Sequence, residues 1–521
     1  MKDERNNLIN VADWIAKWAK IQPDKVAIIS EGRPFTYFEF NSNINRLSNF
    51  FLNLGIKKGD RVALLLRNSR QFVEIFFAVS RIGGILVLLN WRLALPELEF
   101  IIRDSGTDFI VFDYEFMENA EKLWKILPVN TQVACVAGED EKRQDAPPWA
   151  IDSADHIQRF PETMPDLSWA AGDDDPHILM YTSGTTGIPK GAVLSHRKTF
   201  FNVLNAGIYY DMTKADIGIV ARPLFHSGGL IVEMAPVIYR GGTIIIQKRF
   251  TPVDILKTIE KYKVTVLELP ATVYSFILNE CRIEDYDLSS LKCCFTGGER
   301  VPVALLKAYA EKGLTLSQVY GLTEASTLFW LPMENAIEKM GSVGQPVMHS
   351  EVNIVDEKGM PVKTGEIGEV VVKGPIVMNG YWNRDDLTDE VIKDGWFHTG
   401  DLARIDEDGF VYIVDRKKDM FISGGENVYP AGIEKALLSH TAIIDAAVVG
   451  VPDEKWGEVG KAFIVVRNGY SITTEEIYNL LKDKLAKYKI PKYIEFVDKL
   501  PKTASGKIKK LLLRETENKT D

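Results

Sequence analysis

The sequence has few cysteines, no excess of positive charge and no apolar run suited to a membrane. Its 521 residues include 62 lysines and arginines against 72 aspartates and glutamates, which gives a formal charge of −10 and a pI near 5.5. Nucleic-acid-binding proteins usually carry a basic excess, so that class is disfavoured. The four cysteines (Cys135, Cys281, Cys293 and Cys294) lack metal-ligand spacing. We therefore expect reduced core residues in a reducing compartment.

Signals for export or membrane insertion are also missing. The start, Met1–Arg5, lacks the apolar core of a signal peptide. The most apolar run, Phe72–Leu89, contains Glu74 and Arg81 and a Gly-Gly break, so we expect a helix that leads into a buried strand. A cytoplasmic protein without a transmembrane segment is the prediction. With 46% apolar and 26% charged residues, wholesale disorder is excluded.

Between about residues 60 and 325 the chain alternates short β-rich runs with amphipathic helical stretches such as 253–262 and 303–311. This alternation predicts parallel sheets covered by helices. The length favours about three domains, or one large α/β body with an appendage. The strand candidates are 61–66, 84–89, 108–112, 132–136, 243–246, 264–269 and 291–295.

The pattern of expected secondary structure changes after about residue 341. Short strands separated by Gly, Asp and Lys turns predict a small antiparallel module over residues 341–415. A charged run follows at 416–419, where we place a domain boundary. The predicted fold is therefore α/β, with a large domain over 1–416 and a small α+β domain over 417–521. The candidate elements are strands 351–355, 368–372, 409–414, 446–451 and 462–466, and a helix over 474–486.

The strongest local signal is a hydroxyl- and glycine-rich stretch after the apolar run 178–181. It reads Tyr181-Thr182-Ser183-Gly184-Thr185-Thr186-Gly187-Ile188-Pro189-Lys190-Gly191. Glycines let backbone N–H groups converge on an anion, the hydroxyls add donors, and Lys190 adds charge for phosphate oxygens. No Gly-Lys-Ser/Thr closes the stretch, so it is not a Walker loop. A phosphate-binding loop between strands is the prediction.

Two further loops follow apolar strands, where ligands gather in open α/β sheets. They are Thr296-Gly297-Gly298-Glu299 and Gln318-Val319-Tyr320-Gly321-Leu322-Thr323-Glu324. Tyr320 could stack on a base, Thr323 could bond a phosphate and Glu324 could ligate Mg²⁺ through oxygen. A structural turn is the plainer explanation of each loop taken alone.

Together these stretches resemble the adenylate-forming superfamily of acyl-CoA synthetases, luciferases and peptide-synthetase adenylation domains. The match spans roughly residues 25–515. Besides the phosphate loop and Tyr-Gly-Leu-Thr-Glu, it rests on Thr-Gly-Asp (399–401), Asp-Arg-Lys-Lys (415–418) and Pro-Lys-Thr-Ala-Ser-Gly-Lys (501–507), in the family's order and spacing. The resemblance implies that ATP and a carboxylic acid give an acyl-adenylate and pyrophosphate. CoA then attacks the adenylate to form a thioester.

Roles carried over from the family follow by position. The phosphate oxygens would be held by Thr182, Ser183, Gly184, Thr185, Thr186, Gly187 and Lys190, and the adenine would be framed by Gly298, Glu299, Gln318, Tyr320 and Gly321. The catalytic residues would be Thr323 at the α-phosphate, Glu324 on Mg²⁺ and Lys507 between the carboxylate and the α-phosphate. Asp401 and Arg416 would hold the ribose. Lys418 would be the hinge of a mobile small domain, Gly424 and Gly425 would face CoA, and His226, Ser227, Gly228 and Gly229 would border the acyl group.

Alternatives within and beyond the family stay open. A peptide-synthetase adenylation domain needs an acid for the substrate amine, and Glu233 is the first acid after Phe225. A luciferase-like oxygenase would carry a lysine where Ile422 stands. Retention of Lys507 and Glu324 argues against a non-catalytic nucleotide-binding module. A free-standing CoA ligase is therefore preferred, and a homodimer is conceivable by analogy.

The sequence says less about which carboxylic acid is the substrate. The small residues after His226 hint at room for a chain, so a medium- to long-chain fatty acid, and hence fatty-acid and lipid metabolism, is the first expectation. An aryl or alicyclic acid is the second.

Overall fold

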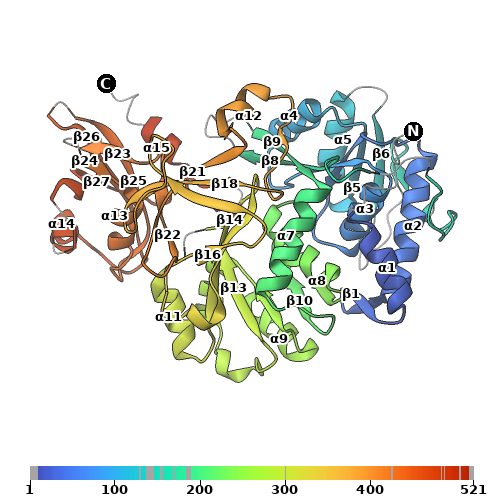
Figure 1. Ribbon diagram of the computed structural model, residues 1–521, viewed down its shortest axis with the longest axis horizontal. Coiled ribbons are helices and arrows are strands. Elements are labelled where there is room, and N and C mark those ends of the chain that lie inside the picture. The colour runs from blue at the N-terminus through green and yellow to red at the C-terminus, as the bar shows by residue number, and fades with distance from the viewer. Residues whose placement is uncertain are drawn as a thin grey trace. The chain divides into compact units, whose positions relative to one another are not determined.

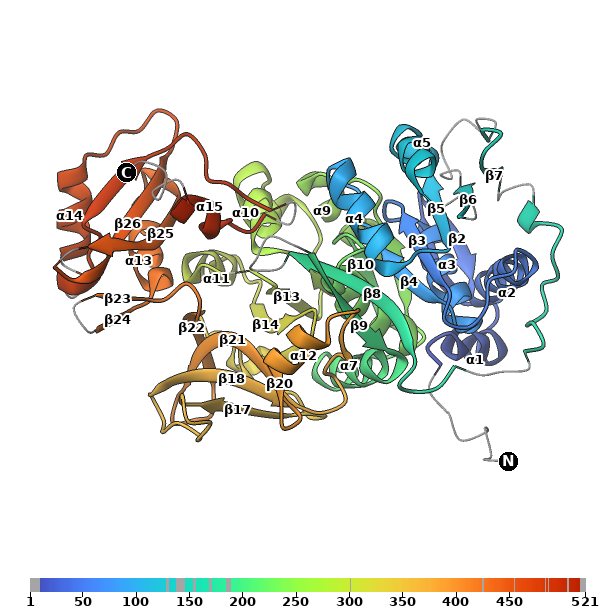
Figure 2. The same ribbon diagram turned by 90° about the horizontal axis from the view of Figure 1, so that it is seen from above.

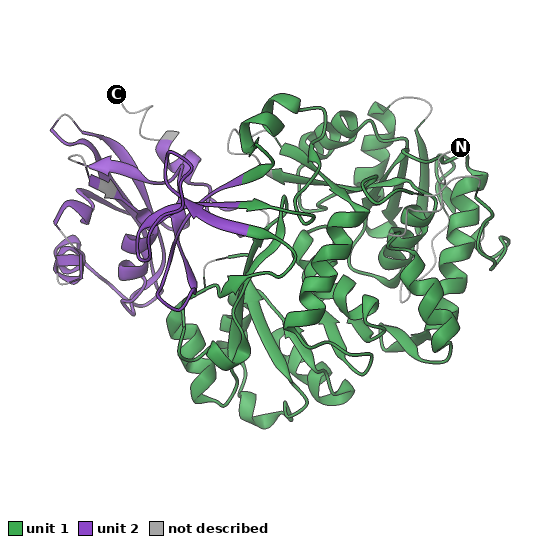
Figure 3. Ribbon diagram, viewed as in Figure 1, with its two compact units in different colours: residues 1–351, 372–397 green, residues 352–371, 398–521 purple. Residues whose placement is uncertain are grey.

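The computed structural model describes residues 10–127, 131–136, 146–152, 156–167, 171–183, 189–299, 301–423, 426–453, 455–482, 484–485, 487–503 and 506–515. The chain divides into two compact units. Unit 1 comprises residues 1–351 and 372–397, and unit 2 comprises residues 352–371 and 398–521 (Figure 3). Unit 2 thus includes part of the antiparallel module as well as the C-terminal residues. The predicted boundary at 416/417 stays a prediction.

The first sheet of unit 1 has nine strands, and its middle strands are parallel. In spatial order they are β16 (Gln345–Pro346), β15 (Ser326–Trp330), β14 (Leu316–Leu322), β13 (Cys293–Gly297), β12 (Val266–Glu268), β10 (Ile217–Val220), β11 (Thr243–Ile246), β1 (Val26–Ser30) and β2 (Arg33–Thr36). The helices that follow or precede these strands are α1 (Asp13–Ile21), α2 (Tyr37–Asn53), α7 (His196–Tyr209), α8 (Ala235–Tyr239), α9 (Pro252–Tyr262), α10 (Ala271–Glu280) and α11 (Val303–Glu311). The predicted parallel sheet with covering helices is confirmed (Figure 1).

The second sheet of unit 1 has eight strands. Their order is β19 (Gly380–Tyr381), β9 (Pro189–Ser195), β8 (Pro176–Ser183), β4 (Ile85–Leu88), β3 (Arg61–Leu65), β5 (Phe109–Asp113), β6 (Gln132–Val136) and β7 (Ile151–Asp152). Its helices are α3 (Arg70–Arg81), α4 (Leu95–Ser105), α5 (Met117–Ile126) and α12 (Asp385–Val391), and α5 lies alongside β5 (Figure 2). Strands β4 and β5 are buried throughout, as expected where both faces of a parallel sheet are covered.

Helix starts in unit 1 follow local sequence signals. Thr36 caps α2 and Thr251 caps α9, each in a reciprocal capping box with the acid three residues later. Helix α7 is capped by Ser195 and packs against both β15 and β9, one strand from each sheet. It therefore joins the two halves of the unit.

The antiparallel module contains β17 (Glu351–Val355), β18 (Ile367–Lys373), β20 (Ile392–Lys393), β21 (Trp396–Ile405) and β22 (Val411–Arg416). The final sheet contains β23 (Phe421–Ser423), β24 (Glu426–Val428), β25 (Ile443–Asp453), β26 (Gly457–Val466) and β27 (Tyr493–Phe496). Its helices are α13 (Pro430–Leu437), α14 (Thr474–Lys482) and α15 (Lys510–Glu515). The predicted fold class is confirmed, although α14 ends at Lys482 instead of reaching residue 486.

The expectation that the cysteines are reduced core residues is confirmed for three of the four. None is in a disulfide, and Cys135, Cys293 and Cys294 are buried in strands, whereas Cys281 is only half-buried at the end of α10. Across the ranges given above, no helix combines the length and the apolarity that crossing a membrane requires.

Candidate active site

The predicted phosphate loop is bracketed by an antiparallel strand pair. β8 ends at Ser183, β9 begins at Pro189, and Thr182 lies opposite Lys190 in the ladder. The strand-then-loop prediction is thus met, with a second strand after the loop. Gly184, Thr185, Thr186 and Gly187 lie outside the described residues, as does the Ser183 side chain.

Hydrogen bonds to Asp104 of helix α4 hold the residues next to this loop. Tyr181 donates its hydroxyl hydrogen to Oδ2 of Asp104 at 2.6 Å, and burial, reinforced by Asp104, raises the pKa of Tyr181. Trp382 Nε1 donates to the Asp104 carbonyl at 3.2 Å. A Cβ at Gly191 would lie 3.0 Å from the Tyr181 ring, so glycine lets the ring lie over the opposite strand.

Glu324 lies in the turn between β14 and β15, and its carboxylate contacts side chains of β8 and β19. Its Oε1 accepts hydrogen bonds from the Tyr381 hydroxyl at 3.0 Å and from Thr182 Oγ1 at 3.5 Å. The Lys190 ammonium lies 5.3 Å from the centre of the Tyr381 ring. The structure thus brings together the predicted metal ligand and two predicted phosphate-binding residues, with Tyr381 in contact with both groups.

The Glu324 carboxylate fits a magnesium ion. Both of its hydrogen bonds use Oε1, and within the described part of the chain Oε2 accepts none. No cluster of three or more His, Cys, Asp or Glu side chains suited to a metal occurs among the described residues. Mg²⁺ is commonly held by one or two carboxylates together with substrate phosphates, and a single acid beside a phosphate loop matches that pattern.

Sequence analysis missed two side chains around Glu324. Tyr381 follows a glycine in a short strand and resembles any sheet aromatic, so its sequence context gives no signal. Lys198 follows His196 and Arg197 and resembles part of an exposed basic helix start. It is instead 1% exposed, and burial lowers its pKa to about 7 against the opposing effect of Glu324.

The predicted adenine-binding residues gather at the carboxyl ends of neighbouring parallel strands. Gly298 and Glu299 follow β13, and β14 pairs directly with β13. We predicted a loop over 318–324, but residues up to Leu322 belong to β14, because its edge pairs with β15. Gln318 is buried and Tyr320 half-buried, while only Thr323 and Glu324 lie in the turn. Glu299 Oε1 accepts from the Thr272 backbone N–H at 3.0 Å and so caps α10.

A buried charge cluster, formed by Arg222, Glu233 and Glu268, lies at the same edge of the sheet. Arg222 follows β10 and its guanidinium lies 3.4 Å from each of the two carboxylates, and its Nη2 donates to the Gly297 carbonyl at 3.0 Å. The pKa of Arg222 is raised overall. Burial alone would lower this pKa, but the negative charges of Glu268 and Glu233 have the larger, opposite effect. Burial raises the pKa of both Glu233 and Glu268. A single guanidinium thus faces two buried carboxyl groups, and the pKa of each acid is raised.

The predicted acyl-pocket residues lie in a loop and a π-helix (Gly228–Met234), a rare form that often marks functional sites. The rings of Phe225 and His226 are 4.4 Å apart. A Cβ at Gly228 would lie 2.9 Å from Arg222 Nη1, so this glycine faces the charge cluster. A Cβ at Gly229 would lie 2.5 Å from the Pro223 carbonyl oxygen, so Gly229 permits a close backbone approach and faces no open space.

In unit 2 the two residues that are predicted to bind the ribose form an ion pair with each other. Asp401 in β21 and Arg416 in β22 are cross-strand partners, with Arg416 Nε 3.0 Å from Asp401 Oδ1. Asp401 is 5% exposed. The acid is therefore fixed by its neighbour, while the arginine remains accessible at its edge of the sheet.

The predicted hinge residue Lys418 and the predicted catalytic residue Lys507 lie in turns of unit 2. Arg514 donates to the carbonyl of the predicted hinge residue Lys418 at 3.1 Å, and burial, aided by Arg416, lowers the pKa of Lys418. Lys507 closes an exposed turn in which Thr503 N–H donates to its carbonyl at 2.7 Å. Gly424 and Gly425 lie outside the described residues, between the paired strands β23 and β24.

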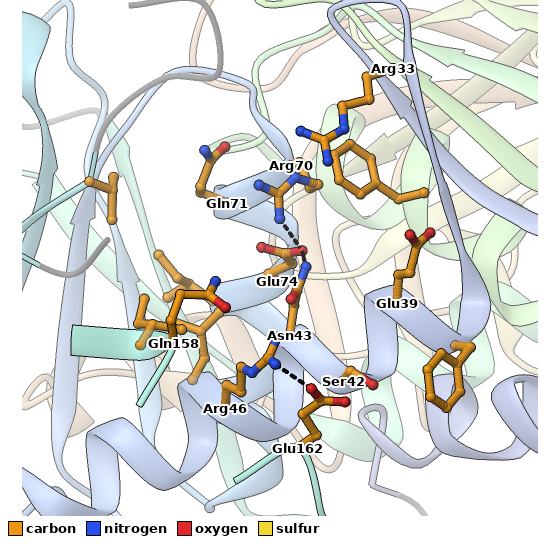
Figure 4. A pocket seen from close by; sticks show the side chains of 16 residues that line it. Arg33, Glu39, Ser42, Asn43, Arg46, Arg70, Gln71, Glu74, Gln158 and Glu162 are labelled. Atoms are coloured by element: carbon orange, nitrogen blue, oxygen red, sulfur yellow. Dashed lines mark hydrogen bonds and ion pairs between the residues drawn. The ribbon is translucent and has the colours of Figure 1, made fainter. Parts of the chain in front are cut away.

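A separate cavity of about 490 Å³ opens between α2 and α3 (Figure 4). Its charged lining is largely paired, with Arg70 bound to Glu74 and Arg46 bound to Glu162. None of the residues predicted to bind ATP or the acid lines it. It is distinct from the candidate active site.

Comparison with known proteins agrees with this geometry. The family model described as "AMP-binding enzyme" matches residues 15–382, and "AMP-binding enzyme C-terminal domain" matches residues 432–507. A feruloyl-CoA synthase from an Amycolatopsis species is 40% identical over 501 residues, which is 96% of this chain and 97% of that protein.

Solved structures agree as well. The o-succinylbenzoate CoA synthetase of Bacillus subtilis in complex with the acyl-adenylate intermediate OSB-AMP is 32% identical, with a TM-score of 0.85 over 97% of this chain and 98% of that one. The same enzyme has been solved with ATP and a magnesium ion, at a TM-score of 0.84 over 96% of this chain and 98% of that one. A fatty acyl CoA synthetase from Mycobacterium tuberculosis is 31% identical, with a TM-score of 0.77 over 98% and 99%. The chain therefore belongs to the AMP-binding enzyme family and is an ATP-dependent, AMP-forming acid–thiol ligase that makes acyl-CoA.

Proposed function

We propose that the acid is an aromatic carboxylic acid that carries a polar ring substituent. The observation that carries this proposal is the charge cluster of Arg222, Glu233 and Glu268 beside Gly228 and Gly298. A Cβ on either glycine would lie within 3.4 Å of Arg222 Nη1, and within the described residues that nitrogen has no hydrogen-bond partner.

A long alkyl chain placed beside this cluster would remove water from polar groups without replacing its hydrogen bonds, which is costly. An aromatic acid with a hydroxyl, methoxy or second carboxyl group could accept a hydrogen bond from Nη1. The names of two of the three similar proteins described above point the same way, since feruloyl and o-succinylbenzoyl groups are aromatic. A fatty acid, our first expectation from sequence, becomes the second candidate and is supported by the mycobacterial relative.

The residue roles are part of the proposal. Thr182 and Lys190 would bind phosphate oxygens, Thr323 the α-phosphate, and Asp401 with Arg416 the ribose. Glu324 would hold Mg²⁺, which offsets the repulsion between carboxylate and triphosphate. Lys507 would stabilise the charge that develops as the carboxylate attacks the α-phosphate. Lys418 would be the hinge between the half-reactions, and CoA would accept the acyl group.

An acid panel tests the substrate class. Pyrophosphate release and thioester formation would be measured with ferulic, 4-hydroxycinnamic, cinnamic, benzoic, 2-succinylbenzoic, cyclohexanecarboxylic, octanoic and palmitic acids. We expect the highest kcat/KM for a ring acid with a polar substituent, about tenfold above its unsubstituted partner, because a site built for a hydrogen bond rejects a substrate that lacks it. Preference for octanoic or palmitic acid over every ring acid would overturn the proposal.

A further inference from the structure

A buried asparagine holds the backbone that leads to the predicted acyl-pocket residues. Asn68 lies between the end of β3 and the start of α3, and it is 7% exposed. Its Nδ2 donates a hydrogen bond to the Arg222 carbonyl at 2.8 Å, and its Oδ1 accepts one from the Leu224 backbone N–H at 2.8 Å. One side chain therefore binds the polar backbone groups on both sides of Pro223, about 150 residues further along the chain.

An asparagine suits this bridge for a chemical reason. Its amide carries a donor and an acceptor, as a peptide group does, whereas an ionised aspartate offers acceptors alone. Proline at position 223 has no backbone N–H with which the loop could fix itself. Because buried backbone groups need partners and water does not reach them, the Asn68 side chain supplies what the loop lacks.

Backbone hydrogen bonds extend from this bridge to His226 and the π-helix. The Pro223 carbonyl accepts from the His226 N–H at 3.1 Å, and the His226 carbonyl accepts from the Leu230 N–H at 3.0 Å. The Arg222 N–H in turn donates to Oε2 of Glu233, near the end of the π-helix, at 3.2 Å. Asn68 thus connects this network to the end of a strand of the second sheet.

The same network sets where the Arg222 guanidinium lies. Asn68 binds the carbonyl of Arg222 and Glu233 binds its N–H, so the peptide groups on both sides of its Cα are held. The guanidinium is held at its far end, where Nη2 donates to the Gly297 carbonyl. The remaining nitrogen, Nη1, is the one assigned above to the ring substituent of the acid.

We propose that Asn68 is a positioning residue for acid selection, which holds Arg222 and His226 beside the acid. The inference rests on the proposed function. Its two hydrogen bonds go to residues 222 and 224, and neither goes to the phosphate-loop strands or to the Glu324 turn. Loss of the bridge should therefore weaken the binding of the acid much more than the binding of ATP.

The test compares two Asn68 variants with a matched buried asparagine. Asn68→Ala removes both hydrogen bonds, and Asn68→Asp keeps the acceptor but turns a second acceptor toward the Arg222 carbonyl. The control is Asn45→Ala. Asn45 in α2 is 3% exposed, donates to the Glu162 carbonyl at 2.6 Å and accepts from Arg81.

Three quantities are measured for each protein: the Kd of Mg²⁺·ATP by calorimetry without acid, the KM for the acid, and kcat for pyrophosphate release. The acid is the one that the wild type prefers in the panel described above. The urea midpoint is recorded for each variant, so that a loss of stability is separated from a loss of acid binding.

For Asn68→Ala and Asn68→Asp we expect the KM for the acid to rise about tenfold, while the Kd of ATP stays within about twofold. The preference for ferulic over cinnamic acid should fall to about twofold, because Arg222 Nη1 is no longer held in place. Asn45→Ala should lower the urea midpoint by a similar amount and leave the KM for the acid and the Kd of ATP within about twofold of the wild type.

Three results would overturn the proposal. They are a folded Asn68→Ala protein with the wild-type KM for the acid, equal losses of acid and ATP binding, and an equal rise in the KM for the acid in Asn45→Ala. If neither Asn68 variant folds, Asn68→Ser takes their place, and failure of all three while Asn45→Ala folds would show a folding requirement and also overturn it. Failure of the proposed function is recognised separately, because a wild-type preference for octanoic or palmitic acid overturns that function. The comparison of acid with ATP is then made with the preferred fatty acid and still decides the role of Asn68.

Discussion

The hydroxyl of Tyr381 lies 3.0 Å from Oε1 of Glu324, while the face of its ring lies 5.3 Å from the Lys190 ammonium. One side chain from β19 thus contacts a carboxylate and a cation that are 134 residues apart in the chain. Burial, followed by the effect of Glu324, raises the pKa of Tyr381, so the phenol stays protonated and acts as a donor. The arrangement holds the carboxylate on the phosphate side of its turn.

Removing this hydrogen bond should weaken the binding of Mg²⁺·ATP. Tyr381→Phe keeps the ring beside Lys190 and loses the donor, which we expect to raise the KM for ATP about three- to tenfold. Tyr381→Leu also loses the ring and should raise it further. Steady-state pyrophosphate release at saturating acid measures both. Equal KM values for Tyr381→Phe and the wild type would mean that this hydrogen bond does not order the site.

The small domain should serve the two half-reactions differently. We expect Lys507→Ala to lower the adenylation rate about 10²–10³-fold, because one preorganised charge is lost, and to leave thioester formation from a preformed acyl-adenylate nearly intact. Lys502→Ala is a matched control in the same segment, since Lys502 pairs with Asp445 at the surface of unit 2. Single-turnover assays of each half-reaction decide the outcome. Parallel losses in both half-reactions of Lys507→Ala would contradict the assigned role.

Strand β14 should tolerate no side chain at Gly321, near its end. A Cβ there would lie 1.9 Å from the Ser326 carbonyl oxygen. Gly321→Ala should therefore lower the midpoint of urea unfolding and abolish most ATP binding. In α7, a Cβ at Gly207 would meet nothing closer than 3.5 Å, so Gly207→Ala should be neutral or stabilising by about 0.5–1 kcal/mol. Similar behaviour of the two variants would show that the close approach at Gly321 is unimportant.

A buried histidine pair should make the fold sensitive to acid. The rings of His177 and His196 stack 4.4 Å apart, and burial lowers the pKa of both, that of His196 to about 4. Between about pH 6.5 and 4 these histidines bind protons in the unfolded chain but stay neutral in the folded protein. The free energy of unfolding therefore falls as the pH falls. For His196 alone the loss at pH 5 is about 2 kcal/mol.

Urea unfolding at pH 7 and pH 5 measures this effect, with His196→Gln as the comparison. The variant should be less stable than the wild type at pH 7 but should lose less stability on acidification. An identical loss in both proteins would exclude His196 as the source.

Much of the architecture could be predicted because local patterns carry it. The runs 61–66 and 108–112 are apolar and appear as buried strands within one residue of the expected bounds. The motifs that are predicted to bind phosphate and ribose could be located because they are contiguous, and the structure places Asp401 beside Arg416 and Thr182 beside Glu324.

The part of the candidate site that the sequence did not predict depends on contacts between segments that are distant in the chain. Tyr381 and Lys198 become site residues only because β19 joins β9 and α7 packs on β15. Gly229 was expected to border the acyl group, but its open side faces the Pro223 carbonyl, so a bulky residue there would test folding instead of selectivity. No periodicity in the sequence predicts the meeting of Arg222 with Glu233 and Glu268, which come from the ends of different elements.

The central claim is that this enzyme activates an aromatic acid as its adenylate and passes it to CoA. Product analysis of a single turnover with ferulic acid, ATP, Mg²⁺ and CoA, matched against octanoic acid, tests it most directly. The account predicts AMP, pyrophosphate and feruloyl-CoA in equal amounts, at a rate at least about tenfold above that with octanoic acid. Formation of ADP, or faster turnover of octanoic acid, would contradict it.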